Sequence, residues 1–211
     1  PVYLMFDQIY WELTMKGTQH FNPVVLRPEM KEYTVFVDGI SKSLSATGVR
    51  VGWSFGPKKV IAKMKSLLSH IGAWAPKAEQ IASANYLSDL DTYSTFLDGQ
   101  REKIYARLKS LYDGFQALKS EGHAVDAITP QAAIYLTIKF DLIGKTTAEG
   151  NVLAETKDVT GYILNEAKIA VVPFYAFGTS VDSPWYRLSV GTCAVEDTEE
   201  IISNLRVALE K

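Results

Sequence analysis

The stretch from Gly39 to Trp53 places a lysine and an arginine in surroundings that favour chemistry. Lys42 is flanked by serines rather than by other charges, and Arg50 follows eight positions later, close to the start of an expected strand. Burial lowers the pKa of a lysine and frees its amine for Schiff-base chemistry. A guanidinium can meet a phosphate with a planar fork of hydrogen-bond donors. The pair therefore suggests a lysine-linked cofactor that carries a phosphate group.

Three further residues lie where functional groups are often found. Asp7 and Tyr10 follow an apolar strand, and functional groups in open α/β sheets gather at the carboxyl ends of strands. Arg187 lies in a strand expected in the second half of the chain. Each residue also has a plainer interpretation. Asp7 can cap a turn, Lys42 and Arg50 can be ordinary surface residues, and Arg187 can end an edge strand.

The order of these motifs decides between the interpretations, because it resembles the order in class I/II (fold type I) pyridoxal-phosphate-dependent aminotransferases. The segment around Lys42 is similar to the cofactor-lysine motif of that family. The resemblance covers essentially the whole chain. The residues that carry it are Asp7 and Tyr10, Gly39-Ile40-Ser41-Lys42, Ser45-Ala46, Gly48-Val49-Arg50-Val51-Gly52, Ala132-Ala133-Ile134-Tyr135-Leu136, Val171-Val172-Pro173, Phe177-Gly178 and Tyr186-Arg187-Leu188-Ser189.

The resemblance implies a role for each candidate residue at the cofactor, pyridoxal 5′-phosphate. Lys42 would form the Schiff base and would move the proton between the substrate α-carbon and the cofactor. Asp7 would face the pyridine nitrogen and keep it protonated, so that the ring serves as an electron sink. Tyr10 would donate its hydroxyl to the phenolic oxygen. Arg50 would bind the phosphate, with Ser41 as a possible helper.

The resemblance also assigns the substrate contact and shows one departure. Arg187 would clamp the substrate α-carboxylate with a bidentate guanidinium. Gly39 stands where many relatives carry a serine that touches the phosphate, so one side-chain donor is missing here. Trp74 and Tyr175 are loop aromatics. In relatives the loop around Trp74 approaches the neighbouring subunit's active site, but core or dimer packing explains either residue equally well.

Composition excludes several other classes of function. The 211-residue chain has a formal net charge of −2 and no basic run, which argues against nucleic-acid binding. Its single cysteine, Cys193, fits a reducing compartment, and we expect a cytoplasmic protein. His20, His70 and His123 share no ligand spacing with one another or with Cys193, so no metal site is expected. No apolar run is long enough to span a bilayer.

The elements predict an α/β protein with two parts. Residues 1–98 are expected to form a portion of the large cofactor-binding domain, a mostly parallel sheet with helices. Residues 99–211 are expected to form a small α+β domain, and a long helix near 91–121 joins the two. The expected strands are 1–6, 34–38, 49–55, 132–140, 169–172 and 185–190, and the other expected helices are 58–70, 77–87, 151–166 and 196–209.

The chain opens on an apolar strand of the kind that is usually covered on both faces, so we expect a fragment. The glycine/serine-rich phosphate turn, the aromatic that stacks on the pyridine ring and an asparagine at the phenolic oxygen would lie upstream. We therefore expect weak or absent cofactor binding by this chain alone, and association with itself or with the missing half.

Three functions remain open. The first is an aminotransferase, which moves an amino group between an amino acid and a 2-oxo acid and acts as a homodimer. A second is another enzyme of the same fold, such as a carbon–sulfur lyase. The third is non-enzymatic: either a cofactor-sensing domain of a transcription regulator or an inactive remnant. Substrate choice cannot be deduced from these residues.

Overall fold

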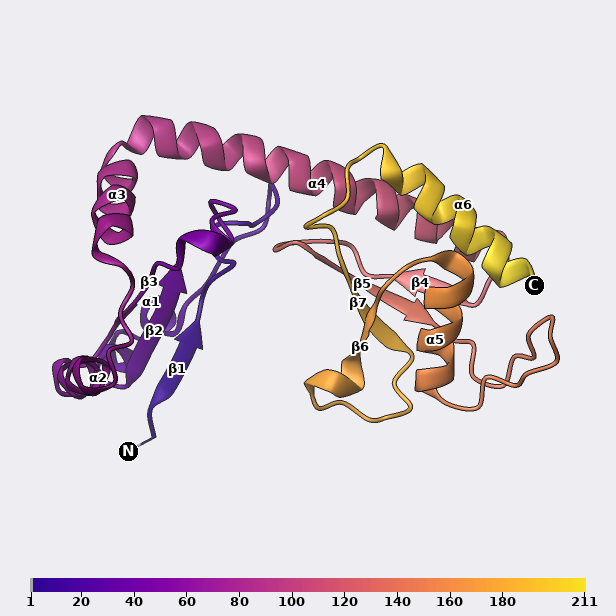
Figure 1. Ribbon diagram of the computed structural model, residues 1–211, viewed down its shortest axis with the longest axis horizontal. Coiled ribbons are helices and arrows are strands. Elements are labelled where there is room, and N and C mark those ends of the chain that lie inside the picture. The colour runs from indigo at the N-terminus through magenta and orange to yellow at the C-terminus, as the bar shows by residue number, and fades with distance from the viewer. Residues whose placement is uncertain (1) are drawn as a thin grey trace. The chain divides into compact units, whose positions relative to one another are not determined.

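The computed structural model describes residues 2–211, and the chain divides into two compact units. The first unit ends at Arg101 and the second begins at Glu102. The long helix α4, Leu90–Ser120, contributes its first turns to one unit and the remainder to the other (Figure 1). The long helix expected near 91–121 is therefore present almost at its predicted bounds. None of the described helices is long and apolar enough to cross a membrane.

A three-stranded sheet organises the first unit. Its strands are β1 (Leu4–Asp7), β2 (Thr34–Gly39) and β3 (Gly52–Phe55), in the order β1-β2-β3. β1 runs parallel to β2 and β3 runs antiparallel to it. The unit also contains α1 (Pro23–Leu26), α2 (Lys58–Ile71) and α3 (Lys77–Ser88), with 3₁₀ turns at Pro28–Glu32 and Thr47–Val49. The expected helices at 58–70 and 77–87 are confirmed.

Two strand predictions need correction. The strand expected from residue 49 begins at Gly52, because Thr47–Val49 forms a 3₁₀ turn and Arg50 adopts the left-handed conformation with φ 61°. The strand expected at 1–6 spans Leu4–Asp7. It is an edge strand of the described sheet and is largely exposed, with Met5 74% accessible, so the described chain does not supply the cover that an apolar strand of this kind usually has. Pro1, where that strand was expected to start, lies outside the described residues. β2, which has a neighbour on each side, is almost wholly buried.

Aromatic side chains link the three strands on one face of this sheet. Phe36 stacks on Phe55 with ring centroids 4.8 Å apart and planes at 8°, and Phe6 meets Phe36 edge-on at 5.6 Å. These three residues are direct register partners across the strands. Cross-strand aromatic pairs of this kind contribute roughly 0.2–1 kcal/mol each. They fix the register that places the ends of the strands.

The second unit contains a four-stranded antiparallel sheet in the order β4-β5-β7-β6. Its elements are β4 (Val125–Ala127), β5 (Tyr135–Phe140), α5 (Thr156–Ala167), β6 (Val172–Pro173), β7 (Trp185–Ser189) and α6 (Asp197–Glu210), with a 3₁₀ turn at Phe174–Phe177. Phe140 lies at the centre of the core, 5.8 Å from the Phe115 ring and 5.4 Å from the Tyr186 ring. The expected antiparallel α+β arrangement is confirmed.

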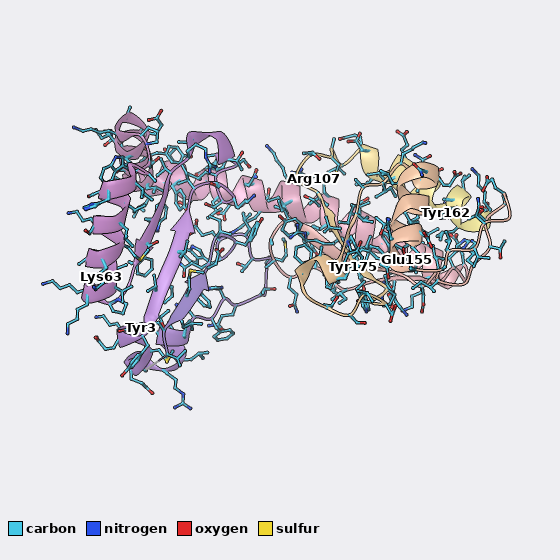
Figure 2. All side chains as sticks on the ribbon, turned by 60° about the horizontal axis from the view of Figure 1, so that its bottom comes forward. Tyr3, Lys63, Arg107, Glu155, Tyr162 and Tyr175 are labelled. Atoms are coloured by element: carbon cyan, nitrogen blue, oxygen red, sulfur yellow. The ribbon has the colours of Figure 1, made fainter. Side chains whose placement is uncertain are left out.

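Helix α5 begins five residues later than the sequence predicts. Glu155 caps it. The side chain of Glu155 accepts the backbone N–H of Asp158, and the side chain of Asp158 accepts the backbone N–H of Glu155, which together form a capping box. Tyr162 on α5 donates its hydroxyl to the carbonyl of Ala208 at 2.5 Å, which ties α5 to α6. Figure 2 labels Glu155, which directly precedes α5, and Tyr162, which lies within it.

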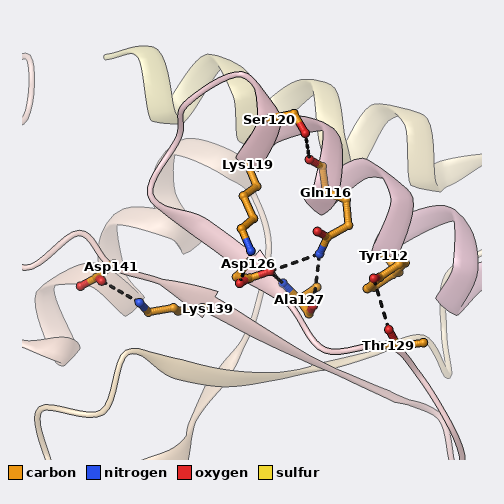
Figure 3. Close-up of polar contacts among 9 residues, drawn as sticks. All are labelled: Tyr112, Gln116, Lys119, Ser120, Asp126, Ala127, Thr129, Lys139 and Asp141. Carbon is orange, nitrogen blue, oxygen red and sulfur yellow. Dashed lines mark hydrogen bonds and ion pairs between the residues drawn. The ribbon is translucent and has the colours of Figure 1, made fainter.

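Strand β4 was not predicted, and contacts from α4 hold it in place (Figure 3). Gln116 donates to the carboxylate of Asp126 at 3.2 Å and to the carbonyl of Ala127 at 3.1 Å. Lys119 makes an ion pair of 2.6 Å with the same carboxylate. These bonds lower the pKa of Asp126, the hydrogen bond from Lys119 being the largest cause. This three-residue strand thus depends on its pairing with β5 and on contacts from a neighbouring helix rather than on its own pattern.

Candidate functional site

The predicted residues of the first unit converge on one edge of its sheet. β1 and β2 are parallel, with Asp7 opposite Val37, so both strands end at the same edge. β3 is antiparallel, with Gly52 opposite Gly39, so it starts there. The turns that follow Asp7 and Gly39 and the turn that precedes Gly52 therefore leave the sheet together. This edge is where open α/β sheets place their ligands.

Lys42 and Tyr10 lie next to each other at this edge. Lys42 follows β2 and is half-buried, and its Nζ lies 5.8 Å from the centroid of the Tyr10 ring. An ammonium within about 6 Å of an aromatic face is attracted by the ring. Two turns separated by about thirty residues of chain thus bring an amine and a phenol together. A half-buried amine beside a hydroxyl suits attachment of an aldehyde and a hydrogen bond to it.

The side chain of Asp7 makes the contact expected of an aspartate that caps a turn. Its carboxylate is exposed, and Oδ1 accepts the backbone N–H of Ile9 at 3.0 Å. Side-chain acceptance two residues ahead is the Asx turn that aspartates favour. The bond fixes the start of the turn that carries Tyr10. The role of Asp7 toward a pyridine nitrogen stays a prediction.

Ser41 lies in the same turn as Lys42, and Arg50 lies just before β3, which starts at the same edge. Arg50 is exposed and donates from Nη1 to the carbonyl of Thr47 at 2.9 Å. Its left-handed backbone is unusual for a residue with a side chain and marks a constrained position. Ser41 is half-buried in the turn beside Lys42. A guanidinium and a hydroxyl here fit the binding of a phosphate.

The structure gives a physical reason for the glycine at position 39. A Cβ added to Gly39 would lie 2.9 Å from the carbonyl oxygen of Val51 and 3.0 Å from the Cα of Gly52. Both neighbours are backbone, so they cannot move aside cheaply. The close approach of β2 and β3 therefore excludes a serine here, and a phosphate at this edge relies on other donors.

Asp38 is a residue of this edge that sequence analysis missed. It is 8% exposed, and its carboxylate accepts three hydrogen bonds. Oδ2 accepts from Nε2 of Gln8 at 3.0 Å and from Nε1 of Trp11 at 2.9 Å, and Oδ1 accepts from the backbone of Gly39 at 2.7 Å. The available signal was a carboxylate within an otherwise apolar buried strand, which calls for partners.

A second set of contacts holds the same turn from helix α4. The hydroxyl of Tyr93 donates to the carboxylate of Glu12, and Nε of Arg101 donates to the Glu12 carbonyl at 2.6 Å. Burial, followed by the bond to Glu12, raises the pKa of Tyr93 well above its usual range. Tyr93 therefore stays protonated and remains a donor. The turn between Asp7 and Leu13 is anchored on both sides.

Arg187 belongs to the second unit, on the inner strand β7. Its guanidinium lies between two aromatic rings, with Cζ 4.3 Å from the centroid of Tyr135 and 4.4 Å from that of Phe177. Rings on both sides hold the fork in one orientation. The half-buried position differs from that of a solvated arginine at a strand end.

The remaining candidates show no shared chemistry. Trp74 is exposed on the loop between α2 and α3, and Tyr175 lies exposed in the turn after β6. His20 packs near the rings of Phe6 and Trp11. Within residues 2–211, no three histidine, cysteine or acidic side chains are grouped to hold a metal ion.

The first unit has a mixed sheet whose parallel strands β1 and β2 end at one edge. An amine, a phenol, a carboxylate and a guanidinium belong to the residues at this edge, which is typical of a domain of the pyridoxal-phosphate-dependent transferase class. The donor set fits that cofactor, since it offers an amine for the aldehyde and a cation for the phosphate. The family model for class I and II aminotransferases matches residues 1–205. The chain therefore belongs to this family, whose members depend on pyridoxal phosphate.

Relatives agree in both sequence and structure. An aspartate aminotransferase of Rhizobium meliloti is 28% identical over the whole chain and over 49% of its own length. A probable aspartate/prephenate aminotransferase of Rickettsia bellii is 31% identical, with 94% of this chain and 47% of that protein covered. The crystal structure of the aspartate aminotransferase from Rhizobium meliloti superposes with a TM-score of 0.87 at 28% identity, covering 99% of this chain and 50% of that one.

These comparisons settle the class and the extent of the match. A Thermus thermophilus aspartate aminotransferase with maleate gives a TM-score of 0.80 at 27% identity, over 98% of this chain and 48% of that one. The chain spans about half the length of the relatives it matches. The expected partial fold type I architecture is confirmed, and the carbon–sulfur lyase and transcription-regulator alternatives are not favoured.

Proposed function

We propose that the complete protein moves an amino group between an amino acid and a 2-oxo acid, with pyridoxal phosphate attached to Lys42. The observation that carries this proposal is the position of the Lys42 amine beside the Tyr10 ring at the carboxyl edge of the sheet. The match to the aminotransferase family over nearly the whole chain supports it.

The chain's own residues divide the work. When bound, the cofactor supplies an electron sink for charge at the substrate α-carbon. The Lys42 amine moves the proton at that carbon. Tyr10 would donate its hydroxyl to the phenolic oxygen, and Asp7 would pair with the ring nitrogen. Arg50 and Ser41 bind the phosphate.

Arg187 is proposed to bind the substrate carboxylate. Its fork is pre-oriented by Tyr135 and Phe177, so little side-chain freedom is lost when two parallel hydrogen bonds form. Because relatives carry the names aspartate aminotransferase and aspartate/prephenate aminotransferase, we propose aspartate as the first donor to test and prephenate as an acceptor.

We further propose that the complete protein is a cytoplasmic homodimer, as the family resemblance implies. Cys193 is the single cysteine of these 211 residues, which supports a reducing compartment. Cell fractionation and sedimentation of the complete protein measure the two properties. A periplasmic or monomeric protein contradicts them.

The attachment site has a direct test that does not depend on activity. The complete protein is incubated with pyridoxal phosphate, reduced with borohydride and digested, and the labelled lysine is identified by mass spectrometry. We expect the label at Lys42 and its loss in Lys42→Ala. The matched control is Lys63→Ala, which removes an exposed lysine of α2 (Figure 2) and should keep the label. A label on another lysine in the wild-type protein refutes the assignment.

A further inference from the structure

We propose that Asp38 is a positioning residue that locks the Tyr10 turn against the Lys42 turn. The inference rests on the proposed function, in which Lys42 carries the cofactor and Tyr10 donates to it. Asp38 itself is two residues short of the Lys42 turn and buried on β2. It therefore acts through the two turns that it joins.

The carboxylate of Asp38 ties the Tyr10 turn to the end of β2. Gln8 and Trp11 stand on either side of Tyr10 in that turn, and both donate to Oδ2, at 3.0 Å and 2.9 Å. The backbone N–H of Gly39, the last residue of β2 before the Lys42 turn, donates to Oδ1 at 2.7 Å. Hydrogen bonds to an ionised acceptor are about twice as strong as neutral ones. One buried carboxylate thus links the Tyr10 turn to the strand that leads into the Lys42 turn.

Contacts from α4 to Glu12 hold the other end of the Tyr10 turn, so the turn is rigid. Glu12 directly follows Trp11, and it is bound by Tyr93 and by Arg101 from helix α4. Residues 8–12 are therefore held at both ends of the segment that contains Tyr10. Without the Asp38 bonds, the α4 contacts and the Asx turn at Asp7 are still present, and so are the backbone hydrogen bonds within the turn and from Gln8 to Val37. The side chains of Gln8 and Trp11 then lose their bonds to β2.

Loss of the Asp38 bonds is expected to change the distance between the Tyr10 phenol and the Lys42 amine. The Tyr10 ring lies 5.8 Å from the Lys42 Nζ. A hydroxyl that must meet one oxygen of a bound ring tolerates little displacement, since misplacement of about 1 Å can cost a hundredfold in rate. Loss of Asp38 is expected to weaken the effect of Tyr10 without removing any contact to the cofactor.

The test uses a graded pair of variants in the complete protein. Asp38→Ala removes all three acceptor bonds, and Asp38→Asn keeps one oxygen that can accept from Trp11. We expect kcat to fall roughly tenfold or more in Asp38→Ala, as loss of charge-assisted bonds implies, with partial recovery in Asp38→Asn and little change in KM. The visible absorption of the bound cofactor at fixed pH should shift as it does in Tyr10→Phe.

A double-variant cycle separates positioning from a general structural role. If Asp38 acts through Tyr10, its effect on the absorption largely disappears in a Tyr10→Phe background, because coupled residues are not additive. Additive effects overturn the inference. The matched control is Asp126→Ala, which removes a carboxylate that also accepts from a glutamine, a backbone N–H and a third donor, but in the second unit (Figure 3). It should leave the absorption unchanged.

Two further readouts keep the inference testable if Asp38→Ala does not fold. Trp11→Phe and Gln8→Met each remove one donor and keep the carboxylate, and each should give a smaller shift in the same direction. Hydrogen exchange of cofactor-free protein should be faster in residues 8–13 in these variants. Unchanged exchange and absorption overturn the inference while the labelled Lys42 still supports the function. A wild-type protein without a Lys42 label overturns the function, and the inference falls with it.

Discussion

At the residue scale, Arg187 is notable because its orientation is set before any ligand arrives. Tyr135 comes from β5 and Phe177 from the turn after β6, and the two rings lie at similar distances from the guanidinium carbon. Strand β7 supplies the arginine between β5 and β6. A planar fork held between rings can accept a carboxylate in its plane. The site is thus built to recognise geometry as well as charge.

The first prediction follows from this geometry. In the complete protein, Arg187→Lys should raise the KM for the amino acid substrate roughly tenfold to a hundredfold, because an ammonium makes a single point contact where the fork makes two. Steady-state kinetics with aspartate measure it. Lys139→Arg, on the neighbouring strand β5, is the control and should leave KM unchanged. A KM for Arg187→Lys equal to that of wild type contradicts the clamp.

The candidate residues after β1 and β2 were proposed from motifs that resemble those of a known family, and their roles stay predictions. The turns after β1 and β2 follow recognisable motifs, and the parallel pairing of the two strands brings Tyr10 to Lys42. Asp38 was missed because its partners Gln8 and Trp11 are 30 and 27 residues away in sequence. Only the pairing of the strands reveals that contact, and no local pattern encodes it.

At the element scale, the long elements were predictable and the short ones were not. Helix α4 has an extended apolar periodicity, so its bounds follow from the sequence alone. Strand β4 has three residues and depends on Gln116 and Lys119. β3 begins later than the sequence predicts, because the residues before it form a 3₁₀ turn. Short elements form because of contacts with neighbouring elements, and local sequence patterns do not show those contacts.

Two glycines within α4 give a matched pair for the second prediction. A Cβ at Gly99 has no atom within 4 Å, whereas a Cβ at Gly114 would lie 2.4 Å from Cγ1 of Ile202 on α6. Gly99→Ala should therefore raise the free energy of unfolding by about 0.5–1 kcal/mol through helix propensity. Gly114→Ala should lower it by about 1–3 kcal/mol through overpacking.

Urea unfolding of each variant measures these two changes. The steric cause has its own control, since Ile202→Ala removes Cγ1 and the rest of the side chain that a Cβ at Gly114 would meet. Gly114→Ala should cost less in the Ile202→Ala background than in the wild-type background. Equal costs in both backgrounds would show that the glycine serves another purpose than the approach of α6 to α4.

At the scale of the whole molecule, the sheet of the first unit is incompletely covered by the described chain. A hollow of about 760 Å³ is lined by Thr34, Phe36 and Phe55 together with His20. Within the described residues, Nε2 of His20 and Oγ1 of Thr34 are buried without a hydrogen-bond partner. An unsatisfied buried polar group costs about 1–3 kcal/mol. The chain spans about half the length of the relatives it matches.

Helix α2 shows the same incompleteness, and it carries the last prediction. Its apolar positions Leu67 and Ile71 are 65% and 70% exposed, one helical turn apart, and Trp74 follows close behind. Exposed apolar patches of this kind find partners, at roughly 25 cal/mol for each Å² removed from water. Residues 1–211 alone should therefore self-associate and bind pyridoxal phosphate weakly.

Leu67→Lys with Ile71→Lys should shift the sedimentation profile toward monomer. Val207→Lys, at a 51% exposed position of α6, should not. A wild-type chain that stays monomeric at every concentration, or a control that dissociates equally, would place the association elsewhere than on α2.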